Sequence, residues 1–193
     1  MSTPETDPHA GAILTGIARA AIESEFRRVT PPHESADWLA VPGASFVTLT
    51  RHGRLRGCIG SLTARHPLGE DVRHNAHAAA FADSRFLPLT APELDGLRIE
   101  VSVLSALEPL EFTSEADALQ QLRPGVDGLA LRWHDHRGTF LPQVWQELPD
   151  RRVFLHQLKR KAGLPEDFWD AKLRLRRYTV KCWQESERPL AHA

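Results

Sequence analysis

Residues 45–62 read SFVTLTRHGRLRGCIGSL, and this stretch predicts a β-hairpin. Residues 45–50 alternate in character and are rich in β-branched and aromatic side chains, a pattern typical of a strand. His52-Gly53 follows at the place of a tight turn. The return strand contains LRGCIG at 55–60, where a cysteine stands between two glycines. The hairpin therefore carries one chemically distinctive side chain, the thiol of Cys58.

Outward from the hairpin, strands and helices follow one another without a regular βαβ rhythm. Helices are expected at 10–28, 67–81, 114–122 and 151–162, and further strands at 97–104, 128–133, 139–145 and 173–183, the third of these interrupted by Pro142. Pro31-Pro32 is expected to close the first helix, and a slip of the apolar phase near Arg176-Arg177 indicates a bulge in the last strand. This order predicts an α+β fold, with a mainly antiparallel sheet flanked by helices in two closely joined subdomains.

The composition is that of an ordinary soluble globular protein, with 41% hydrophobic and 25% charged residues in a chain of 193. Because 24 basic residues face 25 acidic ones, neither a broad nucleic-acid surface nor a membrane surface is expected. One domain is expected at 10–185, with short tails at 1–9 and 186–193. The polar N-terminus does not resemble a signal peptide, so a cytoplasmic location is expected, with Cys58 and Cys182 as free thiols.

Cys58 admits two interpretations. In a regular strand, Arg56 and Cys58 share one face, roughly 6–7 Å apart along the chain. A guanidinium at that range favours the thiolate form, and Gly57 and Gly60 allow a ligand or another backbone to come close. The alternative is a small buried thiol that packs beneath the alanine-rich helix expected at 67–81. The residues alone leave both open.

Two histidines are candidates for a base that would deprotonate the thiol, although the pattern that indicates them is weak. His74 and His77 are three residues apart on the same expected helix and share a face. They could act as a base, or bind a metal with His66 or Cys58, although their spacing is that of no common metal motif. A solvated helix surface is the favoured explanation of the pair, so no metal and no cofactor is expected.

Other polar residues are candidates for binding. Asp83 and Arg85 follow the 67–81 helix, where they could bracket a polar ligand or cap the helix end. Thr90 and Glu93 form a capping-box pattern for a brief helix. Glu100 projects from the face of the 97–104 strand opposite its apolar residues, so it is either solvated or lines a cleft.

Long motifs, in the same order, resemble the AMMECR domain family across roughly residues 10–185. They are FVTLTRHGRLRGCIGSL at 46–62, PLGEDVRHNAHAAAFADSRFLPLT at 67–90, LRIEVSVLS at 97–105, RPGVDGLAL at 123–131, RGTFLPQVW at 137–145 and FLHQLKRKAGL at 154–164. Within the family, the chain is most similar to the bacterial AmmeMemoRadiSam system proteins. Ser84 departs from the pattern, which has a proline there, and the pair of His74 and His77 is not a family feature.

The resemblance implies an α+β fold in two subdomains, with LRGCIG as the functional centre. It adds Asn75, Asp83 and Arg85 to the expected site through the family's NA…AAF…D.RF motif. It also implies that the protein acts together with a Memo-type protein and a radical-SAM protein. The resemblance implies no particular reaction.

Two functions from different classes follow. One is a binding or adaptor module that presents a groove near LRGCIG, with Gly57, Gly60, Asn75, Asp83, Arg85 and Glu100 as its binding residues. The other is an enzyme, or an enzyme subunit, that uses Cys58 as a nucleophile or carrier tuned by Arg56. RNA binding, a third reading, is poorly supported by the balanced charge.

Overall fold

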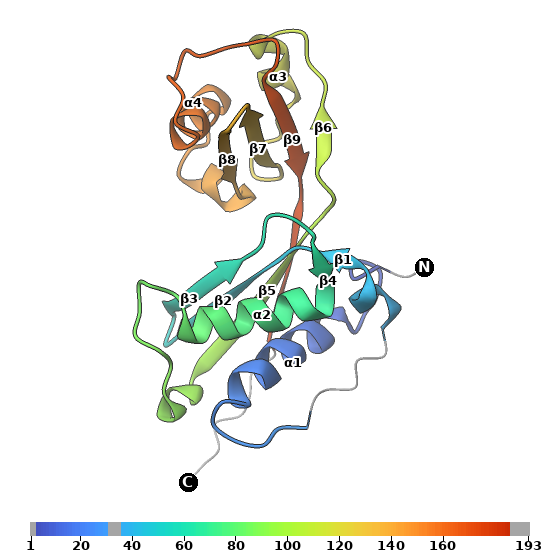
Figure 1. Ribbon diagram of the computed structural model, residues 1–193, viewed down its shortest axis with the longest axis vertical. Helices are drawn as coiled ribbons and strands as arrows, with labels where there is room; N and C mark the ends of the chain where they lie inside the picture. Colours follow the sequence, from blue (N-terminus) through green and yellow to red (C-terminus); the bar gives the residue numbers. More distant parts are fainter. Residues whose placement is uncertain (1–2, 31–35, 186–193) are drawn as a thin grey trace. The chain divides into compact units, whose positions relative to one another are not determined.

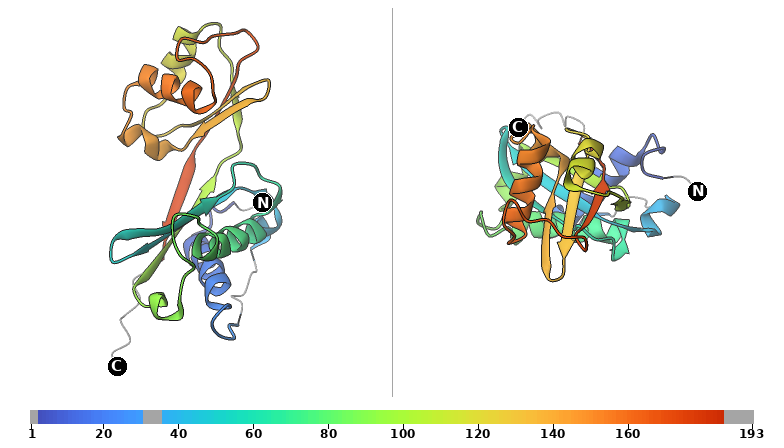
Figure 2. Two further views of the ribbon diagram at one scale, coloured as in Figure 1. Left: turned by 60° about the vertical axis from the view of Figure 1, so that its left-hand side comes forward. Right: turned by 90° about the horizontal axis from the view of Figure 1, so that it is seen from above.

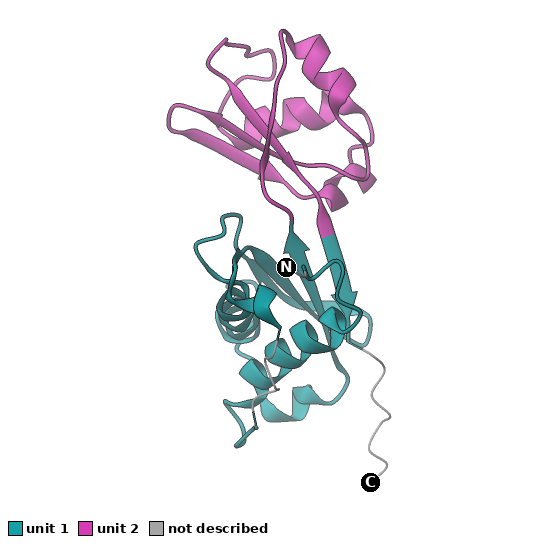
Figure 3. Cartoon of the chain, turned by 90° about the vertical axis from the view of Figure 1, so that its right-hand side faces the viewer, with its two compact units in different colours: residues 1–104, 181–193 teal, residues 105–180 magenta. Residues whose placement is uncertain are grey.

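The computed structural model describes residues 3–30 and 36–185. The chain divides into two compact units, coloured separately in Figure 3: unit 1 comprises 1–104 and 181–193, and unit 2 comprises 105–180. Each unit combines helices with a four-stranded sheet and has its own hydrophobic core. The expected α+β fold is therefore confirmed.

Unit 1 is built on a sheet with the strand order β10-β5-β2-β3, so β3 is an edge strand. Its strands are β2 (Ser45–Arg51), β3 (Arg54–Gly60), β5 (Leu97–Leu104) and β10 (Val180–Gln184, in unit 1 from Lys181), and a separate pair is formed by β1 (Pro42–Gly43) and β4 (His66–Pro67). β2 pairs antiparallel with both β3 and β5. His52 and Gly53 join β2 to β3 with positive φ angles of 50° and 74°, as a tight hairpin turn requires.

Helices cover one face of this sheet (Figures 1 and 2). Unit 1 contains α1 (Ala10–Glu23), α2 (Leu68–Phe81) and the short 3-10 helices η1 (Asp37–Ala40) and η2 (Ala91–Leu94). α1 and α2 pack on each other and on the sheet. Small side chains on α2, among them Ala76, Ala79 and Ala80, are buried there. Among the described residues of unit 1, both α-helices lie on this one face, and the opposite face is called the helix-free face below.

Unit 2 has the strand order β6-β9-β7-β8, and all its pairings are antiparallel. Its elements are β6 (Glu108–Leu110), α3 (Glu115–Gln121), β7 (Gly128–Trp133), β8 (His136–Phe140), η3 (Pro142–Gln146), α4 (Arg151–Lys161) and β9 (Arg174–Tyr178). Ser114 caps α3 through the N–H of Asp117, and Asp150 caps α4. The core includes Trp145 stacked on Phe154, with ring centroids 3.7 Å apart.

Three expected elements differ from the structure. The strand expected at 139–145 is interrupted at Pro142 as predicted, but it ends at Phe140 and does not resume, because Pro142 begins η3. The strand expected at 173–183 is two strands, β9 and β10, which are separated at Thr179, so the bulge expected near Arg176-Arg177 is wrong. The helix expected at 10–28 ends at Glu23.

Some expectations concern parts of the chain outside the described residues. They are the proline stop at 31–32, the tail at 186–193 and the first residues of the tail at 1–9. Within residues 3–9, Asp7 accepts a hydrogen bond of 3.0 Å from the indole N–H of Trp38. In the described parts of the chain, no helix has the length and apolar character that crossing a bilayer demands.

Candidate functional site

The LRGCIG strand contains a bulge. Leu49 pairs with Gly57, but the next residue, Thr50, pairs with Leu55, so Arg56 is an extra residue on β3. Leu55 consequently shares a face with Thr50 and is 45% exposed. A regular strand would have placed it with Gly57 and Ile59 against the helices, so that part of the expected alternation is wrong.

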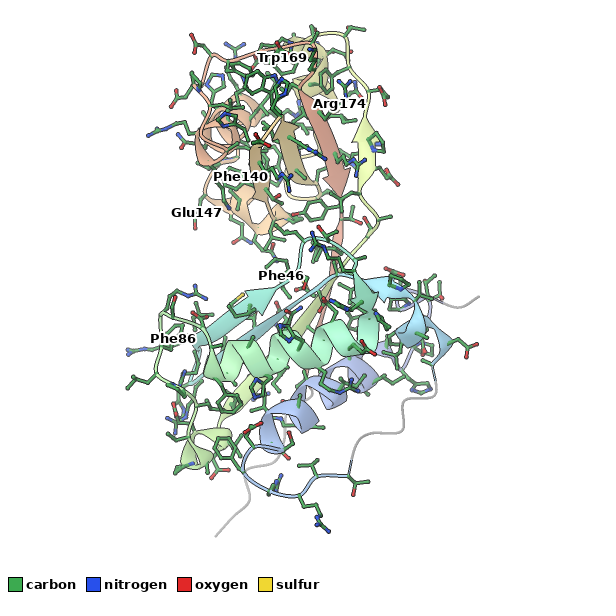
Figure 4. The ribbon with its side chains drawn as sticks, in the orientation of Figure 1. Phe46, Phe86, Phe140, Glu147, Trp169 and Arg174 are labelled. Atoms are coloured by element: carbon green, nitrogen blue, oxygen red, sulfur yellow. The ribbon has the colours of Figure 1, made fainter. Side chains whose placement is uncertain are left out.

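Both glycines of the motif stand where a side chain has no room. A Cβ on Gly57 would lie 2.1 Å from the carbonyl oxygen of Ala79, so this glycine lets α2 approach the strand. A Cβ on Gly60 would lie 2.2 Å from the ring of Phe46, which Figure 4 labels on β2. These contacts give the two glycines a packing role in unit 1.

The Cys58 side chain lies on the face of the sheet opposite α2. Gly57 faces the helix, and successive residues of a strand point to opposite faces. Cys58 is half-buried, pairs with Thr48, and has its sulfur 3.4 Å from the Thr48 hydroxyl. The structure therefore excludes a thiol packed beneath the alanine-rich helix.

The loop that follows α2 covers the edge of β3 at Cys58. The Cys58 N–H donates to Asp83 Oδ2 at 2.9 Å, and Arg85 donates to the Cys58 carbonyl oxygen at 3.2 Å. Arg85 also donates to both carboxylate oxygens of Asp83, at 2.9 and 2.6 Å. Two side chains thus satisfy backbone groups that an edge strand otherwise leaves to water or to another strand.

The charges of this loop stabilise one another. The hydrogen bonds from Arg85 are the main reason why the pKa of Asp83 lies far below its usual range, and the Cys58 N–H lowers it further. The Arg85 pKa is raised, first by the hydrogen bond to Asp83 and in smaller part by the charge of Cys58. Arg85 is therefore a guanidinium held beside Cys58 by Asp83 and by the Cys58 carbonyl oxygen.

Arg56, expected to tune the thiol, is bound elsewhere. It donates to both carboxylate oxygens of Glu93, at 2.8 and 3.2 Å, and to the Leu87 carbonyl oxygen at 2.9 Å. Glu93 also completes the expected capping box with Thr90, which is confirmed. The hydrogen bonds from Arg56 are the largest cause that lowers the Glu93 pKa to about 2.

Sequence reasoning missed the aromatic and apolar part of this region. The guanidinium carbons of Arg56 and Arg85 lie 5.8 and 5.5 Å from the ring centroid of Phe86, which Figure 4 labels on the loop. Leu87, the next residue, is 84% exposed. The capping-box pattern singled out Glu93 in the sequence. No local pattern indicated that Arg56 would be its ion-pair partner.

The remaining candidates lie apart from this loop. Glu100 pairs with Thr48, so it shares the helix-free face with Cys58, and it accepts from Gln184 at 2.9 Å. Asn75 is 2% exposed on α2 and donates to the backbone oxygen of Ser45 at 3.1 Å. Asn75 therefore joins the helix to β2 and does not reach the Cys58 side of the sheet.

The two histidines on α2 have different surroundings. His77 lies 3.2 Å from Glu25 and packs against Phe81, with ring centroids 4.9 Å apart. His74 lines a pocket together with His66. Neither histidine is hydrogen-bonded to Cys58, and within residues 3–30 and 36–185 no group of three His, Cys, Asp or Glu residues could hold a metal ion.

Known proteins resemble this chain over most of its length. A model of the AMMECR1 family matches residues 15–183. A protein of Methanothermobacter thermautotrophicus is 41% identical over 180 residues, which cover 91% of this chain and 94% of the relative. A protein of Thermococcus gammatolerans is 38% identical, covering 91% and 90% of the two chains.

A solved structure is also similar. The crystal structure of the uncharacterized protein PH0010 from Pyrococcus horikoshii superposes with a TM-score of 0.78 at 35% sequence identity, covering 91% of both chains. The match to the family model extends over most of the chain and includes LRGCIG and the loop that covers it. The chain therefore belongs to the AMMECR1 family.

Proposed function

We propose that this AMMECR1-family chain is a cytoplasmic binding component, equivalent to AmmeMemoRadiSam system protein A, that acts with Memo-like and radical-SAM proteins. Its binding surface would be the β3-edge surface, defined here as Leu55, Arg56, Arg85, Phe86 and Leu87. The cytoplasmic location is supported by the two free cysteines, Cys58 and Cys182, which are typical of a reducing compartment.

The observation that carries this proposal is the exposure of large apolar side chains beside arginines. Leu87 is 84% exposed and Leu55 45% exposed, while Arg85 keeps about half of its side chain in solvent at 52%. Exposed apolar groups next to aromatic and arginine side chains are the composition of protein interfaces.

The loop is also held in place before any partner arrives. Asp83 binds it to the backbone of β3, and the ion pair of Arg56 with Glu93 binds its far end. A surface ordered in advance loses less conformational entropy when it binds, which favours affinity. Cys58, Gly57 and Gly60 would then serve the surface by shaping the strand beneath it.

The experiment is an affinity measurement between the full chain and the Memo-like and radical-SAM proteins of its own organism. Leu87→Ser should weaken binding to at least one of them by about tenfold or more, since it removes the most exposed apolar group. Val153→Ser is the matched control, because Val153 is 44% exposed in unit 2. Failure of both partners to bind, or equal binding by L87S and the wild-type chain, would contradict the proposal.

A second candidate function uses Cys58 as a nucleophile or carrier. It is supported by the position of the thiol on the helix-free face and by the guanidinium of Arg85, which binds the backbone of the same residue. Because Glu93 binds Arg56, Arg85 would be the guanidinium that favours the thiolate, with Arg56 holding the loop. Glu100 would lie on the same face as the reacting group.

Alkylation with iodoacetamide, followed residue by residue with mass spectrometry from pH 6 to 9, tests this candidate. Cys182 is exposed and provides an internal standard in the same sample. Alkylation of Cys58 should outpace that of Cys182 at pH 7 and should slow in Arg85→Gln. A Cys58 that reacts more slowly than Cys182 at every pH speaks against thiol chemistry.

A further inference from the structure

A pocket of about 490 Å³ lies at the start of α2, next to the C-terminal end of the LRGCIG strand. Its volume is within the range of sites that hold small molecules. The residues that carry the argument come from the segment after β3 and from the first turns of α2: Ser61, Arg65, His66, Glu70, Asp71 and His74. None of them belongs to the β3-edge surface.

Two of the lining residues, Asp71 and Ser61, belong to a buried polar network. Asp71 is 4% exposed, and its Oδ2 accepts hydrogen bonds from the Ser45 N–H at 2.8 Å, the Ser45 hydroxyl at 2.7 Å and Asn75 at 2.9 Å. Asn75 also donates to the Ser61 hydroxyl at 3.2 Å. Among the residues that the structure describes, all three donors to Asp71 bind Oδ2, so Oδ1 can accept from a molecule in the pocket.

The lining carries both signs of charge. Asp71 and Glu70 offer carboxylates to a cation, and Arg65 offers a guanidinium to an anion. His66 and His74 add imidazole groups that can donate to an anion as well. A ligand that carries only a positive charge would pair with the carboxylates and leave Arg65 without a partner in the ligand. A ligand that carries only a negative charge would pair with Arg65 and leave the carboxylates facing a like charge.

We propose that the pocket binds a small zwitterion of amino-acid or dipeptide size. Its ammonium group binds Asp71 Oδ1 and Glu70, and its carboxylate binds Arg65 with help from His74. Charge-assisted hydrogen bonds of this kind are the strong ones, and two of opposite sense fix the orientation of the ligand. This proposal does not depend on the β3-edge surface or on its partners.

The test uses the full chain with each of the twenty L-amino acids and with glycylglycine, measured by the shift in thermal unfolding midpoint and then by calorimetry. At least one of these probes should raise the midpoint in a concentration-dependent way, as a ligand of the native state does. Its N-acetyl and amide forms, which lack the ammonium or the carboxylate charge, should bind about tenfold or more weakly.

Variants locate the effect. Arg65→Gln and Glu70→Gln replace exposed residues of the lining, so they leave the fold intact, and each should weaken the best probe about tenfold. Arg132→Gln and Glu147→Gln are matched controls on exposed residues of unit 2 and should bind as the wild-type chain does. The proposal is overturned if no probe binds, if the acetylated and amidated forms bind equally well, or if R65Q and E70Q retain full affinity.

Discussion

The carboxylate of Asp83 accepts a 2.9 Å hydrogen bond from the backbone N–H of Cys58 and so closes the open edge of the LRGCIG strand. The same carboxylate holds Arg85, which donates to the Cys58 carbonyl oxygen. The two residues take the place of a neighbouring strand over one residue of β3. The D.RF motif and LRGCIG are therefore parts of one hydrogen-bonded unit, although 24 residues lie between Cys58 and Asp83 in the sequence.

Asp83→Ala should lower the free energy of unfolding by about 1–3 kcal/mol, because it leaves the Cys58 N–H without its acceptor. Asp83→Asn should cost less, since the amide oxygen can still accept from that N–H. Urea denaturation at pH 7 measures both, with Asp95→Ala as the control on an exposed residue of unit 1. Equal stability of D83A and wild type would mean that water replaces the carboxylate without loss.

The pair of Arg56 and Glu93 makes stability depend on acid. The Glu93 pKa falls from 4.5 to about 2 on folding, so the ionised carboxylate stabilises the native state above pH 4.5 and this contribution is lost as the pH falls toward 2. Glu93→Gln should therefore be less stable than wild type at pH 7, with a difference that shrinks below pH 4.5. Urea denaturation at pH 7, 5, 4 and 3 follows this difference, and a gap that stays constant down to pH 3 would contradict it.

The glycines of LRGCIG should respond differently to alanine. Gly57→Ala sets a methyl group against the backbone oxygen of Ala79, which α2 holds in place. It should lower the free energy of unfolding by about 3 kcal/mol or more. Gly60→Ala meets the Phe46 side chain instead. Adding Phe46→Ala to Gly60→Ala should therefore give a double variant more stable than the two single losses add up to. Strict additivity in this cycle would disprove the contact.

In unit 2, Lys159 is fully buried and its ammonium lies 2.8 Å from Glu115, which is 27% exposed. Glu115→Ala leaves a buried cation without its carboxylate and should cost near the lower end of ~3–5 kcal/mol. Lys159→Met removes the charge itself and should cost less. Glu166→Ala is the control, because it breaks an exposed ion pair with Arg160, which lies on the same helix as Lys159. It should cost below about 1 kcal/mol. A larger loss in K159M than in E115A would reverse the argument.

Local sequence pattern was sufficient for most elements. The hairpin, the 97–104 strand, the capping box of Thr90 and Glu93 and the helix that follows Asp150 all appear where periodicity and turn chemistry predict them. Each of these depends on interactions within a few residues, which the order of side chains encodes directly. The interruption expected at Pro142 is present, but the residues after it form η3 and do not continue the strand.

The candidate site was predicted as a set of residues but not as an arrangement. Asp83, Arg85 and Cys58 were named, and the structure brings them together. Arg56 was assigned to the thiol because regular alternation places it on the same face at short range. The bulge makes Arg56 an extra residue of the strand, and Glu93 binds it from a segment 37 residues away. No pattern within β3 reports a partner at that distance.

The sequence by itself determined the α+β class, the hairpin, the glycines on either side of Cys58 and membership of a family, because these depend on local order. Only the tertiary structure decided that the thiol faces away from α2, that Arg85 binds the Cys58 backbone while Arg56 binds Glu93, and that Gly57 and Gly60 serve packing. The physical reason is that one bulged residue and one loop from beyond α2 set which charges meet across the edge of β3.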